Sequence, residues 1–364
     1  MIAVIADDFT GAAELAGISL RYGLKVGISL NNEIDTDVDV LVVNTDSRSL
    51  KKKEALEATA GAIQRVLALK PGILYKKIDS VLRGYVLEEL EIQLQLTGLN
   101  KVLVVPANPT LGRTVTNGHY FVDGKPIHES AFSTDPEFPV KSSEIKRMLN
   151  SDTMEVIKPS DPLPREGIVV GECTSENDCK AWADKIDNSW ILAGAGDFYA
   201  ALLGRKFRPQ EQSGFQWEGP HLYVSGTSLR ERKEFIREID RKQHCVSYLP
   251  RIIDEDWLNE TVDILRARQK LIIAIDDAGD TASVLRGRMA EAVTGILARV
   301  HVWEIFIEGG STAAAILKEM KIEKLSPINE LERGVVRMKA NDLFITVKPG
   351  SYELPEEIER LYNP

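Results

Sequence analysis

The first half of the chain alternates short apolar runs with longer segments of helical periodicity. The apolar runs have strand length and lack regular apolar–polar alternation, which is typical of strands buried on both faces. They are Ile2–Ala6, Lys25–Leu30, Val38–Asn44, Ile73–Ile78 and Val102–Val105. The helical segments between them are Gly11–Tyr22, Leu50–Lys70 and Val81–Leu96. Strands that alternate with helices predict crossover connections and a mainly parallel sheet.

Weaker signals of the same kind continue to about position 200. Strand candidates lie at Glu155–Lys158, Ile168–Val170 and Trp190–Ala193, and helix candidates at Val140–Asn150 and Glu176–Ile186. The stretch Thr116–Pro139 has few helix formers and several turn residues. We interpret this stretch as a functional excursion beside a cleft, because long connections of this kind usually serve a site.

From Leu203 to Pro220 the chain becomes polar and rich in Gly, Pro and Gln, which is typical of an interdomain linker. Strands and helices then alternate again. The strands are His221–Ser225, Leu271–Asp276, Val302–Ile307 and Leu343–Val347, and the helices are Leu229–Lys242, Thr281–Arg299 and Ser311–Met320. We expect an α/β protein of two domains, residues 1–210 and 211–364, each a mainly parallel sheet flanked by helices. The active site is expected in the cleft between the domains.

Composition narrows the class of protein. The 364 residues are 43% hydrophobic and 27% charged, and 45 basic against 55 acidic side chains give a formal charge of −10. This balance argues against nucleic acid or an anionic membrane as partner. The three cysteines form no CxxC pair, the five histidines show no metal-ligand spacing, and no signal peptide or membrane-length apolar run is present. We expect a cytoplasmic enzyme without a protein-bound metal site; the oligomeric state stays open, with a homodimer as one outcome.

Ligands of open parallel sheets bind at the carboxyl ends of the strands, so the loops that follow strands are the place to search. The first such loop begins Asp7-Asp8-Phe9-Thr10-Gly11. Two carboxylates at a strand end can hold Mg²⁺ or accept a hydroxyl proton. The simpler interpretation is helix capping, which accounts for one aspartate better than for two.

Two further loops place cations at strand ends. They are Asn44-Thr45-Asp46-Ser47-Arg48 and the segment from Lys76 to Gly84, which contains Lys77, Asp79, Ser80 and Arg83. Guanidinium groups fork onto carboxylates, and hydroxyls with helix N–H groups take further oxygens, so an anion fits here. Solvated surface charge is the alternative for either arginine taken alone.

The second half carries no Walker A loop and no dinucleotide fingerprint, but it has three short glycine-rich elements at strand ends. They are Ser225-Gly226-Thr227-Ser228, Glu308-Gly309-Gly310-Ser311-Thr312 and Lys348-Pro349-Gly350-Ser351. Their N–H groups and hydroxyls suit phosphate oxygens, which favours a nucleotide site. Tight turns explain each element taken alone.

Four sequence strings carry a resemblance to a known family. They are ADDFTGAAE from Ala6, NTDSR from Asn44, KKIDSVLRG from Lys76 and VPANPTLGRTVTNGHYFVDGKPIHES from Val105. Together they resemble the four-carbon acid sugar kinases. The resemblance implies an N-terminal domain that binds a small sugar acid and a C-terminal domain that binds ATP. It implies substrate contacts at Asp8, Arg48 and the Asp79–Arg83 loop, and nucleotide contacts at Ser225, Gly309-Gly310 and Gly350.

We therefore predict an ATP- and Mg²⁺-dependent kinase that phosphorylates a hydroxyl of a four-carbon sugar acid. Asp8 is the first choice to deprotonate the hydroxyl and Asp79 the second, and Lys77 steadies the transferring phosphoryl group. Arg48 and Arg83 hold the carboxylate of the acid. The predicted substrate-binding residues are Asp8, Arg48, Asp79, Ser80, Arg83 and Gly84. The predicted ATP-binding residues are Ser225, Gly309, Gly310, Ser311, Thr312 and Gly350.

A second hypothesis is a non-catalytic sugar-acid sensor with a degenerate ATP site. Ser311 raises it, because members of the resembled family usually carry an acidic residue after the paired glycines. Nucleotide binding separates the two hypotheses.

Overall fold

The computed structural model describes residues 1–31, 33–135, 138–211, 217, 219–227, 229–276, 279–350 and 352–362. The chain forms two compact units. The first comprises Met1–Gly27 and Asp35–Gln210, and the second comprises Ile28–Ile34 and Glu211–Pro364. Each unit has a mainly parallel sheet flanked by helices, so the predicted α/β class is confirmed. The cleft between domains stays a prediction.

The first sheet is built on strands that are buried on both faces. Its order is β3 (Val40–Asn44), β1 (Ile2–Ala6), β4 (Ile73–Lys77), β11 (Ile191–Gly194), β5 (Lys101–Val105), β10 (Gly167–Gly171) and β9 (Glu155–Ile157). All neighbouring pairs in this order are parallel. Every residue of β1 and β3 is buried, as the unbroken apolar runs predict.

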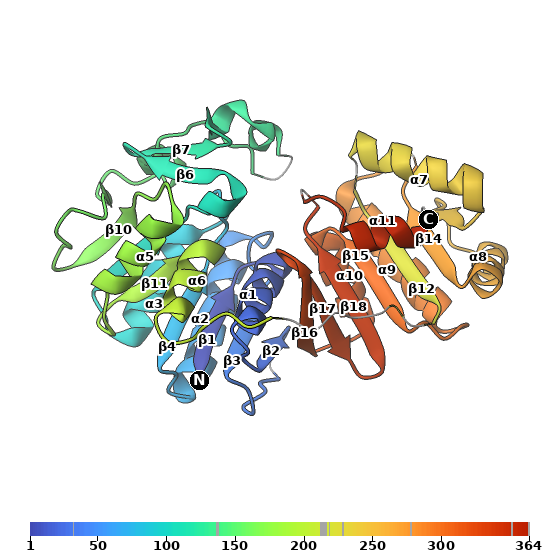
Figure 1. Ribbon diagram of the computed structural model, residues 1–364, viewed down its shortest axis with the longest axis horizontal. Coiled ribbons are helices and arrows are strands. Elements are labelled where there is room, and N and C mark those ends of the chain that lie inside the picture. Colours follow the sequence, from blue (N-terminus) through green and yellow to red (C-terminus); the bar gives the residue numbers. More distant parts are fainter. Residues whose placement is uncertain are drawn as a thin grey trace. The chain divides into compact units, whose positions relative to one another are not determined.

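Helices cover both faces of this sheet (Figure 1). Helices α1 (Phe9–Arg21), α5 (Glu176–Lys185) and α6 (Gly196–Gly204) pack together on one face, and α2 (Lys52–Ala68) and α3 (Val86–Thr97) pack together on the other. The chain leaves β1 toward β3 and leaves β4 toward β5, in opposite directions across the sheet. A topological switch point therefore lies between β1 and β4, where a doubly wound sheet opens a crevice for ligands.

The second sheet is also mainly parallel and has crossover connections. Its order is β13 (Val246–Tyr248), β14 (Lys270–Ala274), β12 (His221–Ser225), β15 (Glu304–Glu308), β18 (Leu343–Lys348), β17 (Val335–Ala340) and β16 (Lys324–Glu332). The first five strands are parallel, and β17 and β16 are antiparallel. At its edge, β16 pairs with Ile28 and Ser29 of β2 (Val26–Ser29). The switch point of this sheet lies between β12 and β15.

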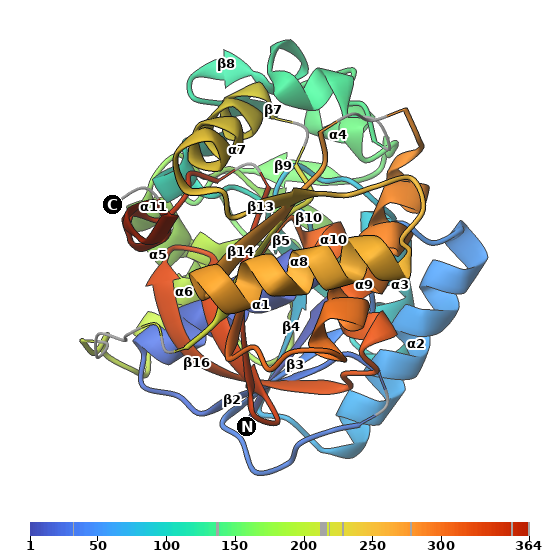
Figure 2. The ribbon, with the colours of Figure 1, turned by 90° about the vertical axis from the view of Figure 1, so that its right-hand side faces the viewer.

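Within the described residues, five helices flank the second sheet. They are α7 (Arg230–Gln243), α8 (Glu255–Arg268), α9 (Ala282–Leu297), α10 (Gly310–Glu319) and α11 (Glu356–Tyr362). Ile236 and Ile239 of α7 join Ile358 and Tyr362 of α11 in a core cluster against Tyr223 of β12. Helix α9 packs against both α8 and α10, with α8 toward the viewer in Figure 2.

A small three-stranded antiparallel sheet forms the excursion after β5. It consists of β6 (Arg113–Thr116), β7 (His119–Val122) and β8 (Lys125–Pro126), followed by short 3-10 helices at Ile127–Glu129 and Ala131–Thr134. Two-residue turns connect the strands, and Asn117, Gly118, Asp123 and Gly124 all have positive φ. Asn-Gly and Asp-Gly are the pairs that such hairpin turns favour.

Several predicted elements differ from the structure. The helix expected from Val81 begins at Val86, because a turn with Leu82 at φ 63° and Gly84 at φ 89° occupies the preceding residues. The helix expected over Val140–Asn150 shrinks to α4 (Ile145–Met148). The sequence interpretation missed α6, α8, α11, β13, β16 and β17. Across the described ranges, no helix has the length and apolarity needed to cross a bilayer.

Candidate active site

The predicted substrate loops meet beside the switch point of the first sheet. Asp7 and Asp8 follow β1, Arg48 follows β3, and Asp79 follows β4. In register, Ala6 at the end of β1 lies between Asn44 of β3 and Lys77 of β4. Three loops far apart in sequence thus converge because parallel neighbours end at the same edge of the sheet.

Asp8 is both a helix cap and a half-buried carboxylate. Its Oδ1 accepts a hydrogen bond from the backbone N of Gly11 at 2.9 Å and so caps α1. Its Oδ2 accepts the hydroxyl of Thr10 at 2.5 Å. Capping therefore applies to Asp8, but Asp8 also takes part in the ion network described next.

Arg48 links three carboxylates. Its Nε and Nη2 donate to Asp7 at 2.9 Å each, Nη2 lies 2.8 Å from Oδ1 of Asp8, and Nη1 lies 3.5 Å from Oδ1 of Asp79. Only 12% of the Arg48 side chain is exposed. The fork with Asp7 is the bidentate geometry that fixes a guanidinium most firmly.

The charges of this network set the ionisation of its carboxylates. Burial raises the pKa of Asp7 in spite of Arg48. Burial would also raise the pKa of Asp8, but Arg48, Lys77 and the Thr10 hydroxyl lower it below its ordinary value. Against the same burial, Arg48 and Arg83 hold the pKa of Asp79 far below its usual range. Asp8 and Asp79 are therefore carboxylates at neutral pH, and each can accept a hydrogen bond from a hydroxyl group.

The loop after β4 closes around its own arginine. Arg83 donates from Nε and Nη2 to Asp79 at 2.7 and 2.9 Å, and from Nη1 to Asp135 at 2.7 Å. A Cβ on Gly84, at φ +89°, would lie 3.4 Å from Cγ of Arg48. That distance is ordinary contact, so it is the positive φ that favours glycine at position 84.

Lys77 lies deeper than the sequence suggested. Its Nζ lies 3.3 Å from Oε2 of Glu14 and donates to the carbonyl of Ile78 at 2.9 Å, and 4% of the side chain is exposed. Glu14 also accepts the amide of Asn108 at 3.1 Å. A Cβ on Gly11 would lie only 3.2 Å from Nζ of Lys77, so this ammonium lies directly beneath the Asp8 loop. The neighbouring Lys76 is fully buried and serves the fold.

The excursion adds groups that the sequence analysis did not select. Arg113 donates from Nη1 to the Ser80 hydroxyl. The guanidinium carbons of Arg83 and Arg113 lie 5.7 and 5.5 Å from the ring centre of Phe132, and Asp135 follows shortly after it. Arg113 lies within a string that carried the family resemblance, but its spacing from the other loops gave no separate signal.

The three glycine-rich elements of the second unit lie side by side at its switch point. Ser225, Glu308 and Lys348 are neighbours in register at the ends of β12, β15 and β18. Gly309 has φ +104° and precedes α10, which begins at Gly310. Ser311 is exposed and Thr312 is buried. Ser228 and Ser351 lie outside the described residues.

Glu308 is a fully buried carboxylate that holds this edge together. It accepts the hydroxyls of Tyr223 at 2.8 Å and Ser225 at 3.1 Å. Lys348 lies 3.0 Å and Arg232 3.2 Å from its Oε1. Burial lowers the pKa of Lys348, and Glu308 opposes that shift. A buried carboxylate with two cations and two hydroxyls is well compensated, and it anchors Ser225 beside the Gly309 turn.

The residues around this turn fit phosphate groups. Helix α10 is ten residues long and presents its free N–H groups at Gly310 and Ser311. A Cβ built on Gly350 meets nothing within 4 Å, so the described residues leave open space directly beside this glycine. The nucleotide site at this edge of the second sheet stays a prediction.

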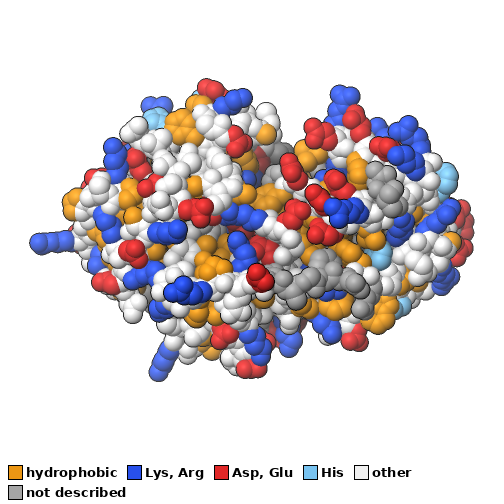
Figure 3. Space-filling model, in the orientation of Figure 1, with side chains coloured by type: hydrophobic (Ala, Val, Ile, Leu, Met, Phe, Trp, Pro, Cys, Tyr) orange, Lys and Arg blue, Asp and Glu red, His pale blue; other side chains and the backbone are white. Residues whose placement is uncertain are grey.

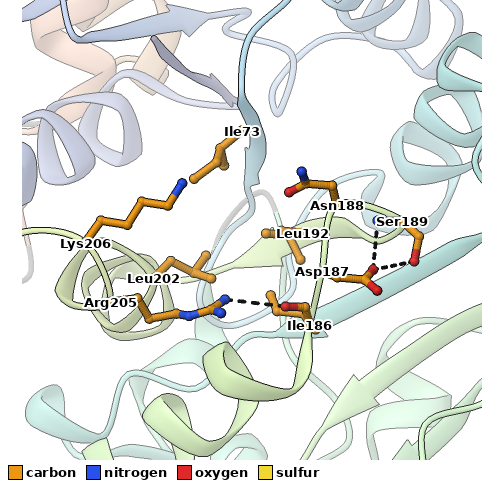
Figure 4. A pocket seen from close by; sticks show the side chains of 9 residues that line it. All are labelled: Ile73, Ile186, Asp187, Asn188, Ser189, Leu192, Leu202, Arg205 and Lys206. Carbon is orange, nitrogen blue, oxygen red and sulfur yellow. Dashed lines mark hydrogen bonds between the residues drawn. The ribbon is translucent and has the colours of Figure 1, made fainter.

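Two hollows lie elsewhere, at the amino ends of β4 and β11. The larger has a volume of about 640 Å³ and is lined by Ile73, Leu192, Leu202, Asn188, Arg205 and Lys206 among others (Figure 4). The other, about 420 Å³, shares Ile73, Asp187, Asn188 and Leu192 with it. Neither contains a predicted site residue, and both lie at the edge opposite Asp8.

The face of the molecule drawn in Figure 3 carries charges of both signs. On the described part of the face drawn in Figure 3, basic and acidic side chains are interspersed. Among the residues that the structure covers, no group of three or more His, Cys, Asp or Glu is arranged to hold a metal ion. All three cysteines are buried and free of disulfides.

Comparison with known proteins adds a second line of argument. The model of a sugar-binding N-terminal domain matches residues 2–201. A D-threonate kinase of Salmonella typhimurium is 33% identical over 96% of this chain and 94% of its own length. A 3-oxo-tetronate kinase of Haemophilus influenzae is 24% identical over 97% of both chains.

Solved structures show the same fold. A crystal structure of a Haemophilus influenzae protein superimposes with a TM-score of 0.77 at 19% identity and covers 98% of both chains. A Salmonella typhimurium structure gives a TM-score of 0.81 at 17% identity, covering 100% of this chain and 98% of its own.

Proposed function

Because the chain belongs to the four-carbon acid sugar kinase family, we propose that it transfers a phosphoryl group from ATP to a hydroxyl of a four-carbon sugar acid. Relatives named D-threonate, D-erythronate and 3-oxo-tetronate kinase support this class of substrate. The observation that carries the proposal is the meeting of Asp8, Arg48 and Asp79 at the switch point of the first sheet.

The first unit binds the acid in this proposal. Asp8 accepts the proton of the attacking hydroxyl, since its carboxylate is ionised and one fifth of the side chain is exposed. Asp79 positions a second hydroxyl through its oxygens, and Ser80 and Gly84 complete the loop. Arg48 holds both aspartates in place through its ion pairs. Lys77, close beneath the loop, stabilises negative charge as the phosphoryl group arrives.

The second unit binds ATP. Ser225, Gly309, Gly310, Ser311, Thr312 and Gly350 supply the donors and the open space for its phosphates. Mg²⁺ held by the ATP phosphates would neutralise part of their charge. The aspartates of the first unit are engaged by arginines and fit hydroxyl groups better than a metal ion.

Activity on a panel of acids tests the proposal. The purified chain is incubated with ATP–Mg²⁺ and each enantiomer of threonate and erythronate, and with 3-oxo-tetronate. ADP release is coupled to NADH oxidation, and ³¹P NMR identifies the phosphate monoester. We expect turnover of at least one acid. No phosphorylated product from any acid would refute the kinase.

The sensor hypothesis is not favoured, because the relatives are named as kinases. The exposed Ser311 is the residue that raises it. Thermal unfolding with millimolar ATP–Mg²⁺ decides between the two: nucleotide at 100 times its Kd stabilises a protein by about 2.7 kcal/mol, whereas a degenerate site gives no shift.

A further inference from the structure

Three arginines lie at the substrate end of the first sheet, and two of them have little left to offer a ligand. Arg48 directs its nitrogens to Asp7, Asp8 and Asp79. Arg83 directs Nε and Nη2 to Asp79 and Nη1 to Asp135. A substrate carboxylate at either guanidinium would compete with carboxylates that are already bonded.

Arg113 is different. Its guanidinium contacts no carboxylate among the described residues, and its one hydrogen bond runs from Nη1 to the Ser80 hydroxyl. Nε and Nη2 remain for an incoming anion. Packing over Phe132, 5.5 Å from the ring centre, limits the orientations of the guanidinium plane.

The fold holds Arg113 firmly at this place. Its backbone N and O both pair with Asn108, at 3.2 and 2.9 Å, where the excursion leaves the end of β5. Tyr120 of β7 lies close enough to Arg113 and Asp79 to interact with their charges. Its hydroxyl is buried and has no hydrogen-bond partner among the described residues. Burial raises the pKa of Tyr120, and the charges of Arg113 and Asp79 act on it in opposite directions.

We propose that Arg113 binds the carboxylate of the sugar acid through its free guanidinium edge, an inference that rests on the proposed function. The acid end of the substrate then lies against the excursion, and its hydroxyls face Asp8 and Asp79 at the strand ends. Arg48 and Arg83 act as positioning residues for these carboxylates. Arg113 thereby selects acids over neutral polyols of the same length.

The preference for an acid over its primary amide tests this assignment. The amide has nearly the same shape and lacks the charge. We expect Arg113→Met to lower kcat/KM for the acid by about 10- to 150-fold, which corresponds to the loss of a charged hydrogen bond. The kcat/KM for the amide and the KM for ATP should stay unchanged. The kcat/KM of Arg113→Lys for the acid should lie between those of wild type and Arg113→Met, because lysine keeps the charge but loses the forked geometry of the guanidinium. Arg147→Met, at a side chain that is 77% exposed, is the matched control and should behave as wild type.

Calorimetric titration of the acid without nucleotide separates this inference from the proposed function. A wild type that binds acid tightly, with the loss confined to the Arg113 variants, supports the assignment even if turnover fails. If Arg113→Met folds and still prefers acid to amide as wild type does, the assignment is overturned while the kinase stands. If Arg113→Met does not fold, the preference of Arg113→Lys for the acid over the amide decides the question instead. A wild type that neither binds nor phosphorylates any acid overturns both.

Discussion

Asp8→Asn removes a charge and a basic lone pair while it keeps the shape of the side chain. Asparagine caps helices about as well as aspartate, so the bond from the Gly11 amide at 2.9 Å survives. The pair with Nη2 of Arg48 at 2.8 Å is weakened. A charged hydrogen bond contributes about 1.5–3 kcal/mol, and the loss here should stay near the lower figure because Asp7 and Asp79 still hold Arg48.

The effect on the reaction should be much larger than the effect on stability. A side chain that accepts a proton in the transition state contributes about 10²–10⁴-fold to rate. We expect kcat to fall by that factor in coupled ADP release, with ATP binding unchanged in calorimetry. Asp254→Asn is the matched control, since Asp254 also caps a helix, accepting the Trp257 amide at 2.9 Å in the second unit.

The ionisation of Asp8 should also be visible in the dependence of kcat on pH in the acid range. Because the folded pKa of Asp8 is lowered, its ionised form persists below the ordinary aspartate value of about 3.9. Its stabilising contribution is complete above the unfolded pKa and is lost as pH falls through the folded pKa. The acid limb of kcat should therefore lie below pH ~4 in wild type and vanish in Asp8→Asn.

Asp79→Asn in the same assay can contradict this assignment. We expect it to raise the KM for the acid with a smaller change in kcat, because Asp79 binds and does not take the proton. A collapse of kcat in Asp79→Asn beside a mere rise of KM in Asp8→Asn would exchange the two roles. If both variants show wild-type kinetics, the active site does not lie at this edge of the sheet.

Three further predictions concern the second unit and the core. Gly309→Ala strains a backbone at φ +104° by about 1–3 kcal/mol and should raise the KM for ATP in steady-state kinetics without altering acid binding. Glu308→Gln should also raise that KM and lower the melting temperature, because Lys348 loses its buried counter-charge. Glu89→Gln breaks a buried ion pair with Lys76 at 2.7 Å and should lower the free energy of unfolding, measured with urea, by about 3–5 kcal/mol. The double variant Lys76→Met with Glu89→Leu should recover most of that lost stability.

Much of the site could be predicted because its loops directly follow strands. Parallel strands end at one edge, so a motif adjacent to a strand end is placed by the strand itself. Asp8, Arg48 and Asp79 meet for this reason, and so do Ser225 and Gly309. No tertiary information beyond strand order was needed.

Other features depend on contacts that periodicity does not encode. Val81 and Leu82 are buried and continue the helical pattern, yet the backbone turns there because Asp79 accepts the amide and guanidinium of Arg83. Asp135 reaches Arg83 from 52 residues away, and no spacing rule anticipates that distance. The missed α8 was readable, since Asp254 caps it and its apolar residues recur at helical spacing.

The hairpin excursion has a consequence for how substrate preference could change. Its two tight turns close locally, Asn108 pairs with Arg113 at its base, and Val115 of β6 bridges to Cys173, which follows β10. In our proposal the groups that bind the hydroxyls follow strands of the main sheet, whereas Arg113, Phe132 and Asp135 belong to the hairpin excursion. Grafting the excursion together with its contact residue Cys173 between homologues should therefore transfer acid specificity while the phosphoryl-transfer machinery stays intact, which makes the excursion a unit for engineering new acceptors.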